Sequence, residues 1–121
     1  MKYMLLVHHD EAAFDKLSDA TKRDMLAQSV QLTHQLHVNR QYLSASPLQL
    51  AATAVVVRMR EGKPLVTDGP FIETREQIAG YFLIDAKDFN EAIRIAARVP
   101  GARIGAVEVR PLIEITGLPD D

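Results

Sequence analysis

Two short stretches of this sequence are apolar on both faces of an extended chain, and they constrain the fold more than any other feature. Residues 3 to 7 read Tyr-Met-Leu-Leu-Val, and residues 81 to 84 read Tyr-Phe-Leu-Ile. Such short, fully apolar runs are typical of central strands in a sheet. Because an apolar sheet face must be covered, these strands require further layers on both sides of the sheet.

Apolar periodicity predicts two helices between the strands. The first spans residues 19 to 38, is capped by Ser18 and is closed by Asn39 in a left-handed conformation. The second spans residues 89 to 98, where Asp88 and Glu91 have capping-box spacing. The expected buried stripes are Met25, Ser29, Leu32 and Leu36 in the first helix, and Phe89, Ala92, Ile93, Ala96, Ala97 and Val99 in the second. Further strands are expected at residues 42 to 45, 54 to 60, 63 to 67, 80 to 86 and 106 to 113, with a loop at 11 to 17 and a brief helical turn at 74 to 78.

The resulting order is β-α-β-β-β-β-α-β, within a single domain of 121 residues whose last residues, 114 to 121, are expected to fray. Without the hairpin that turns at Glu61 and Gly62, this is the β-α-β-β-α-β order of the α+β ferredoxin-like fold. Two helices cover only one face of its antiparallel sheet. A second copy of the sheet would cover the other, so the sequence predicts a homodimer.

Composition excludes several classes of function. Fourteen Lys and Arg against sixteen Asp and Glu give a net charge of −2, which does not favour binding to nucleic acid. The chain has no cysteine, and neither a signal peptide nor a membrane span is expected, so a cytoplasmic location is predicted by default. Neither His34 with His37 nor the run His8-His9-Asp10 supplies three converging metal ligands, and no cofactor-binding motif is present.

Asp68 is the first candidate for chemistry. It precedes Gly69 and Pro70, which make the turn after a strand rigid. Its carboxylate either caps backbone N–H groups of the turn or faces a pocket as a general base. His8 ends the first strand, and it is either a partly exposed strand-end residue or the partner of Asp68 in an acid/base dyad.

The segment Asp68-Gly69-Pro70-Phe71, followed ten residues on by Gly80-Tyr81, resembles the signature of the YCII-related family in its Asp-Gly-Pro-Phe (DGPF) branch. The first strand and the closing residues 106 to 112 resemble the family as well, so the likeness covers nearly the whole chain. The resemblance implies a dimeric α+β barrel. It also implies an activity that is poorly defined: a His and an Asp in a pocket suggest an enzyme, whereas frequent neighbourhood with extracytoplasmic-function sigma factors suggests a regulatory role.

Several other side chains are candidates for substrate binding. Arg58, Glu108 and Arg110 alternate with apolar residues, so they are either solvated or face a barrel, where a guanidinium could hold an anionic substrate. Phe71 and Tyr81, like Phe82 and Phe89, are most simply core anchors, and the Tyr81 hydroxyl has the best claim to a pocket.

These patterns favour a small-molecule pocket near Asp68 and cofactor-independent proton transfer on a small anionic substrate. Asp68 and His8 would move protons, while Arg58 or Arg110 would orient the substrate. Two rival hypotheses are a non-catalytic ligand-binding or regulatory module, and a structural dimer in which Asp68 only caps its turn.

Overall fold

The structure, a computed structural model, describes residues 1 to 119, and this part of the chain forms a four-stranded sheet, a separate hairpin and three α-helices. The strands are β1 (Lys2–His9), β2 (Tyr42–Pro47), β3 (Val55–Arg60), β4 (Lys63–Asp68), β5 (Gln77–Asp85) and β6 (Ala106–Pro111). The α-helices are α1 (Glu11–Asp15), α2 (Asp19–Val38) and α3 (Phe89–Ala96), and the 3-10 helices are η1 (Ala51–Thr53) and η2 (Pro100–Arg103).

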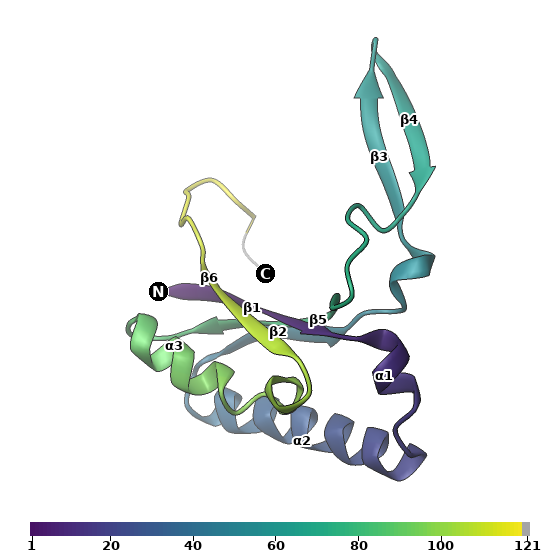
Figure 1. Ribbon diagram of the computed structural model, residues 1–121. Coiled ribbons are helices and arrows are strands. Elements are labelled where there is room, and N and C mark those ends of the chain that lie inside the picture. Colours follow the sequence, from purple (N-terminus) through teal and green to yellow (C-terminus); the bar gives the residue numbers. More distant parts are fainter. Residues whose placement is uncertain (120–121) are drawn as a thin grey trace.

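The main sheet has the order β2-β5-β1-β6, and every neighbouring pair is antiparallel. This order, with α2 and α3 on one side (Figure 1), confirms the predicted α+β ferredoxin-like fold with an inserted hairpin. The first strand lies in the centre of the sheet, where Leu6 is opposite Tyr81 of β5 and opposite Glu108 of β6. Within residues 1 to 119, no helix combines the length and the apolar character that crossing a bilayer requires.

The core lies between this sheet and the helices. Alternate side chains of β1 and β5 point into it, so Leu5 and Ile84 are fully buried while Met4 and Leu83 face the other way. From the helices, Leu32 and Leu36 of α2 and Ala92, Ile95 and Ala96 of α3 complete the core. The two apolar runs therefore form the central strands of the sheet, β5 and β1, as predicted.

Strands β3 and β4 form a hairpin that stands on the side of the sheet opposite the helices (Figure 1). Its turn residues Glu61 and Gly62 both have positive φ, 52° and 78°, as a tight two-residue turn requires. Nearly all of its side chains are exposed, including those of Val57, at 60%, and Met59, at 68%.

Four local predictions are wrong. Residues 11 to 15 are helical because Asp10 accepts a hydrogen bond from the Ala13 N–H and caps α1. The helical turn at 74 to 78 is absent, since residue 77 already pairs with His9 in the sheet. In α3 the buried stripe includes Ile95, whereas Ile93 is 48% exposed. At the end of α2 the left-handed residue is Arg40, with φ 60°.

Candidate functional site

The sheet face that carries no helix brings together several of the predicted site residues. The alternation of β1 places Met4, Leu6 and His8 on this face, and we call it the open face. The register adds Tyr81 and Leu83 from β5, Glu108 and Arg110 from β6, and Ser44 from β2. Its centre is apolar, and ionisable groups lie along the β1–β6 side.

His8, Glu108 and Arg110 form a hydrogen-bonded chain on the open face. The His8 Nε2 atom lies 3.1 Å from Glu108 Oε1, and Arg110 Nη2 donates to Glu108 Oε2 at 2.8 Å. The His8 side chain is the most enclosed of the three, at 23% exposure, against 41% for Glu108 and 68% for Arg110. Two neighbouring strands therefore hold an imidazole against a carboxylate that is also bound by a guanidinium.

The electrostatics of this chain favour an ionised carboxylate. The hydrogen bond from Arg110, and next the one from His8, hold the pKa of Glu108 below its ordinary value. A carboxylate only accepts hydrogen bonds, so the contact requires His8 Nε2 to carry its proton. In the neutral imidazole, Nδ1 is then the nitrogen that can accept a proton.

Replacing Arg110 with methionine is expected to raise the pKa of Glu108, because the largest cause of its lowering is removed. In the unchanged protein, the stabilising contribution of these contacts should be present above the ordinary value of 4.5 and be lost as the pH falls through the lower pKa of the folded protein. Carboxyl ¹³C NMR titration measures the pKa of Glu108 in the unchanged protein and in Arg110→Met. Arg60→Met, in the exposed hairpin, is the matched control, and an unchanged Glu108 titration in Arg110→Met would contradict the assigned cause.

Tyr81 also lies on the open face, and its hydroxyl has a partner. The Tyr81 hydroxyl and Ser44 Oγ are 3.1 Å apart, across the β2–β5 pair. Of the aromatic residues predicted as core anchors, Phe82 is buried, whereas Phe71 is 66% exposed and Phe89 is 44% exposed. The prediction of a core role is therefore wrong for Phe71 and for Phe89.

Three predicted site residues, Arg58, Asp68 and Phe71, lie at the hairpin and not beside His8, Glu108 and Arg110. Asp68 ends β4 opposite Val55, and its carboxylate has no hydrogen bond or ion pair with any residue from 1 to 119. The turn is held by the backbone, since the Gly69 N–H donates to the Ala54 carbonyl at 2.8 Å. The guanidinium of Arg58 lies 5.1 Å from the centre of the Phe71 ring. In this structure His8 is thus bonded to Glu108 and not to Asp68.

Sequence reasoning missed two groups of side chains. Around the segment after Phe71, Arg75 pairs with Asp10 at 3.4 Å, and Glu11 Oε2 accepts from the Ala51 N–H at 2.9 Å. A cavity on the helix side of the sheet is lined by His9 and Lys22, among others. Consecutive residues of a strand point to opposite faces, so the sequence could have placed His9 on the face opposite to His8, where the cavity lies. No group of three or more His, Asp or Glu among residues 1 to 119 is arranged to hold a metal ion.

Comparison with known proteins identifies relatives of the whole domain. The family model described as "YCII-related domain" matches residues 1 to 116. The chain is also similar to the protein of Rhizobium meliloti (strain 1021) named "Uncharacterized protein R00369", with 35% identity over 124 residues that cover 93% of this chain and 92% of that protein. The matched residues include the sheet, all three α-helices and the hairpin. This chain therefore belongs to the YCII-related family.

Proposed function

We propose that this protein binds a small anionic molecule on the open face of its sheet and transfers a proton to or from it with His8. The observation that carries the proposal is the 3.1 Å contact between His8 Nε2 and Glu108 Oε1, on a face with no helix above it. A base held in one tautomer by a carboxylate is a recurrent arrangement for proton transfer.

Each of the three hydrogen-bonded residues, His8, Glu108 and Arg110, has a separate task in this proposal. His8 takes the proton on Nδ1, and Glu108 balances the positive charge that then develops on the imidazole. Arg110 contacts Glu108 through Nη2, so its other N–H groups are available to a substrate carboxylate. In this proposal the carboxylate that works with His8 is that of Glu108, which takes the role in the acid/base dyad that the sequence suggested for Asp68.

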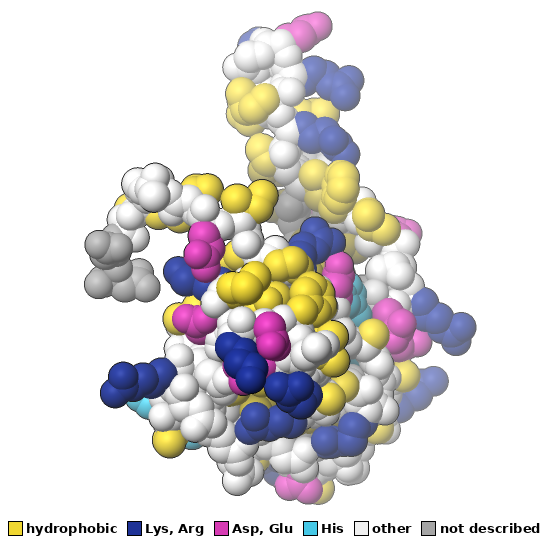
Figure 2. Space-filling view, turned by 90° about the vertical axis from the view of Figure 1, so that its left-hand side faces the viewer, with side chains coloured by type: hydrophobic (Ala, Val, Ile, Leu, Met, Phe, Trp, Pro, Cys, Tyr) yellow, Lys and Arg dark blue, Asp and Glu magenta, His cyan; other side chains and the backbone are white. Residues whose placement is uncertain are grey.

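A homodimer is part of the proposal, because a second copy would cover the open face. The support is the apolar centre of that face, formed by Met4, Leu6 and Leu83, together with the exposed apolar side chains of the hairpin (Figure 2). The hairpin rises on the same side as the open face (Figure 1), so in a face-to-face dimer it would extend beside the partner's sheet. Asp68, at the end of β4, would join the site only through such an arrangement.

Deuterium uptake tests the proposed chemistry directly. Small 2-oxo and 3-oxo carboxylates are incubated with the protein in D₂O, and the loss of their exchangeable C–H signals is followed by proton NMR. The protein is expected to accelerate exchange in at least one of them above the buffer rate, since a positioned base contributes about 100-fold or more. Exchange at the buffer rate for every compound in the panel would contradict proton transfer.

Replacing Leu6 with glutamate is expected to convert a dimer into a monomer. The substitution places a charge in the apolar centre of the open face, which a sheet-to-sheet interface would have to bury unpaired. Analytical ultracentrifugation of both proteins measures the change. Val38→Glu is the matched control, because Val38 is 80% exposed at the end of α2. An unchanged protein that sediments as a monomer at micromolar concentration would exclude the dimer.

The association with a sigma factor stays a prediction from the family resemblance. It differs from the enzyme hypothesis in its expected behaviour: a regulatory module would co-purify with its protein partner and show no deuterium exchange.

A further inference from the structure

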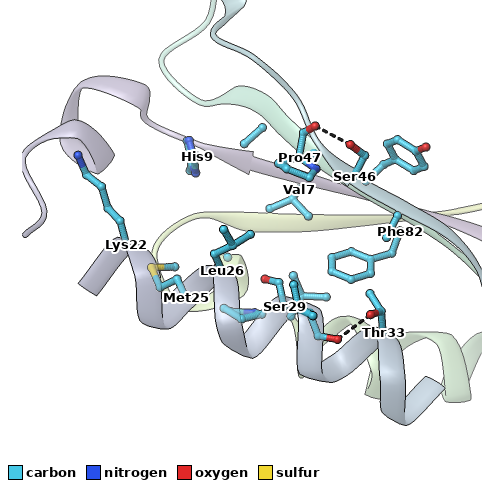
Figure 3. A pocket seen from close by; sticks show the side chains of 18 of the residues that line it. Val7, His9, Lys22, Met25, Leu26, Ser29, Thr33, Ser46, Pro47 and Phe82 are labelled. Atoms are coloured by element: carbon cyan, nitrogen blue, oxygen red, sulfur yellow. Dashed lines mark hydrogen bonds between the residues drawn. The ribbon is translucent and has the colours of Figure 1, made fainter. Parts of the chain in front are cut away.

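A cavity of about 320 Å³ lies between the first half of α2 and the sheet (Figure 3). It is on the helix side of the sheet, so the central strands separate it from the His8–Glu108 pair on the open face. The proposed function does not use this space, and a ligand there would be distinct from one on the open face.

The cavity exists because α2 packs closely only along its second half. Leu32 and Leu36 are buried against the sheet, whereas Ser29 and Met25, one and two turns earlier on the same stripe, are only half-buried. Beside them Leu26 is 55% exposed. The opposite wall comes from the sheet, with Val7 and Phe82 above the gap in Figure 3.

The size and the walls of the cavity suit a small, mainly apolar molecule. Ligand pockets have volumes of about 300 to 1,000 Å³, and an engineered apolar cavity of about 150 Å³ is large enough for benzene. Covering the exposed apolar surface of Leu26 and Val30 would provide a hydrophobic driving force for binding.

One end of the cavity is polar and carries a positive charge. There the His9 ring stacks on the Phe14 ring, with 4.6 Å between the ring centres and an interplanar angle of 12°. The Lys22 Nζ atom lies 5.8 Å from the centre of the Phe14 ring. Burial lowers the pKa of His9 below its ordinary value of 6.5, so this imidazole is neutral at neutral pH. Among the lining residues, all within the described part of the chain, Lys22 is the only charged one.

The contacts of Lys22 leave it able to bind an anion. Its ammonium donates to the Asp15 carbonyl at 3.1 Å and lies 3.6 Å from Asp15 Oδ1, on a side chain that is 90% exposed. Such an exposed ion pair is weak. Within residues 1 to 119, no hydrogen bond is formed by the side chains of His9 or Ser29.

We propose that this cavity is a binding site for a compact apolar molecule with one anionic group, such as an aromatic carboxylate. The apolar body lies between α2 and the sheet, against Met25 and Phe82. The anionic group lies at the Lys22 end, where the His9 ring supplies a further hydrogen-bonding atom; the Ser29 hydroxyl lies about two turns further along α2, in the wall beside the apolar body. The charge of Lys22 selects the anion over a neutral molecule of the same shape.

Two probes of nearly equal size and different charge test this site: 2-naphthoate and 2-naphthamide. Both are titrated into protein labelled with ¹³C at the methionine methyl groups. The Met25 methyl, in the cavity wall, is expected to shift on addition of naphthoate, while the Met4 methyl, on the open face, keeps its position. This measurement uses the unchanged protein, so it does not depend on any variant folding.

Three substitutions locate the contacts. Lys22→Met is expected to weaken naphthoate binding about fivefold and to leave naphthamide binding unchanged. Arg23→Met is the matched control, because Arg23 is the next residue of α2, is exposed and does not line the cavity. Ser29→Phe should fill the cavity and weaken the binding of both probes by about tenfold or more.

The site is overturned if the Met4 methyl shifts in place of Met25, or if neither methyl shifts at millimolar naphthoate. It is also overturned if folded Ser29→Phe binds both probes as the unchanged protein does. Equal affinity for the two probes, with no effect of Lys22→Met, would refute the anionic group. Deuterium exchange at the open face is measured separately, so failure of this site leaves the proposed function untouched.

Discussion

Replacing His8 with glutamine is expected to slow protein-dependent deuterium uptake by about 100-fold or more, with the fold unchanged. The glutamine amide can still form a hydrogen bond to Glu108 but cannot accept a proton at neutral pH. The rate constant at saturating substrate is measured by proton NMR in D₂O, together with far-UV circular dichroism.

His34→Gln is the matched control, because His34 is exposed on α2, and this helix lies on the other side of the sheet from the open face (Figure 1). Glu108→Gln tests the positioning role. It keeps the size of the side chain but no longer stabilises a protonated imidazole, so it should lower the rate constant while the apparent substrate affinity changes little. Full activity in His8→Gln would exclude His8 as the base.

Replacing Leu36 with alanine is expected to reduce the free energy of unfolding by about 2 to 5 kcal/mol. Leu36 is fully buried where α2 contacts the sheet, so the change opens a void that the surrounding side chains cannot fill completely. Urea denaturation at a fixed protein concentration measures the difference, since a dimer would make the apparent stability depend on concentration.

The control for this prediction is in the same helix. Leu26 is 55% exposed beside the α2 cavity, so Leu26→Ala should cost less than about 1 kcal/mol. Equal losses in the two variants would mean that the first half of α2 is packed as closely as the second, and that the cavity is closed in solution.

Much of the fold follows from local sequence patterns. The alternation in β6, the bounds of α2 and the Glu61-Gly62 turn each correspond to the observed element, whereas of the predicted stripe of α2 only Leu32 and Leu36 are buried. These features are predictable because hydrophobic periodicity and turn geometry act over a few residues. Short segments were less predictable. The helix α1 depends on a single capping contact of Asp10, and residue 77 is extended because β1 offers it a partner.

The candidate site was only partly predictable. Alternation placed His8, Glu108 and Arg110 opposite apolar faces, but their pairing depends on β6 lying next to β1, which is a property of the sheet order. His8 and Glu108 are separated by 100 positions in the chain. Asp68 was emphasised because its turn is distinctive in sequence, whereas the structure shows that the turn is held by the backbone of Gly69 and Ala54.

The central position of β1 has a consequence for how the protein folds during synthesis. β1 is made before every other element of the sheet, yet its two neighbours are β5 and β6, with Lys2 opposite Asp85 and Tyr3 opposite Pro111. A strand that is apolar on both faces therefore stays unpaired on one edge until the chain is complete to residue 111. Closing such long loops is slow. Between the synthesis of β1 and that of β6, the nascent chain thus carries an apolar strand without its full set of neighbours, and we expect chaperones to bind β1 in that interval.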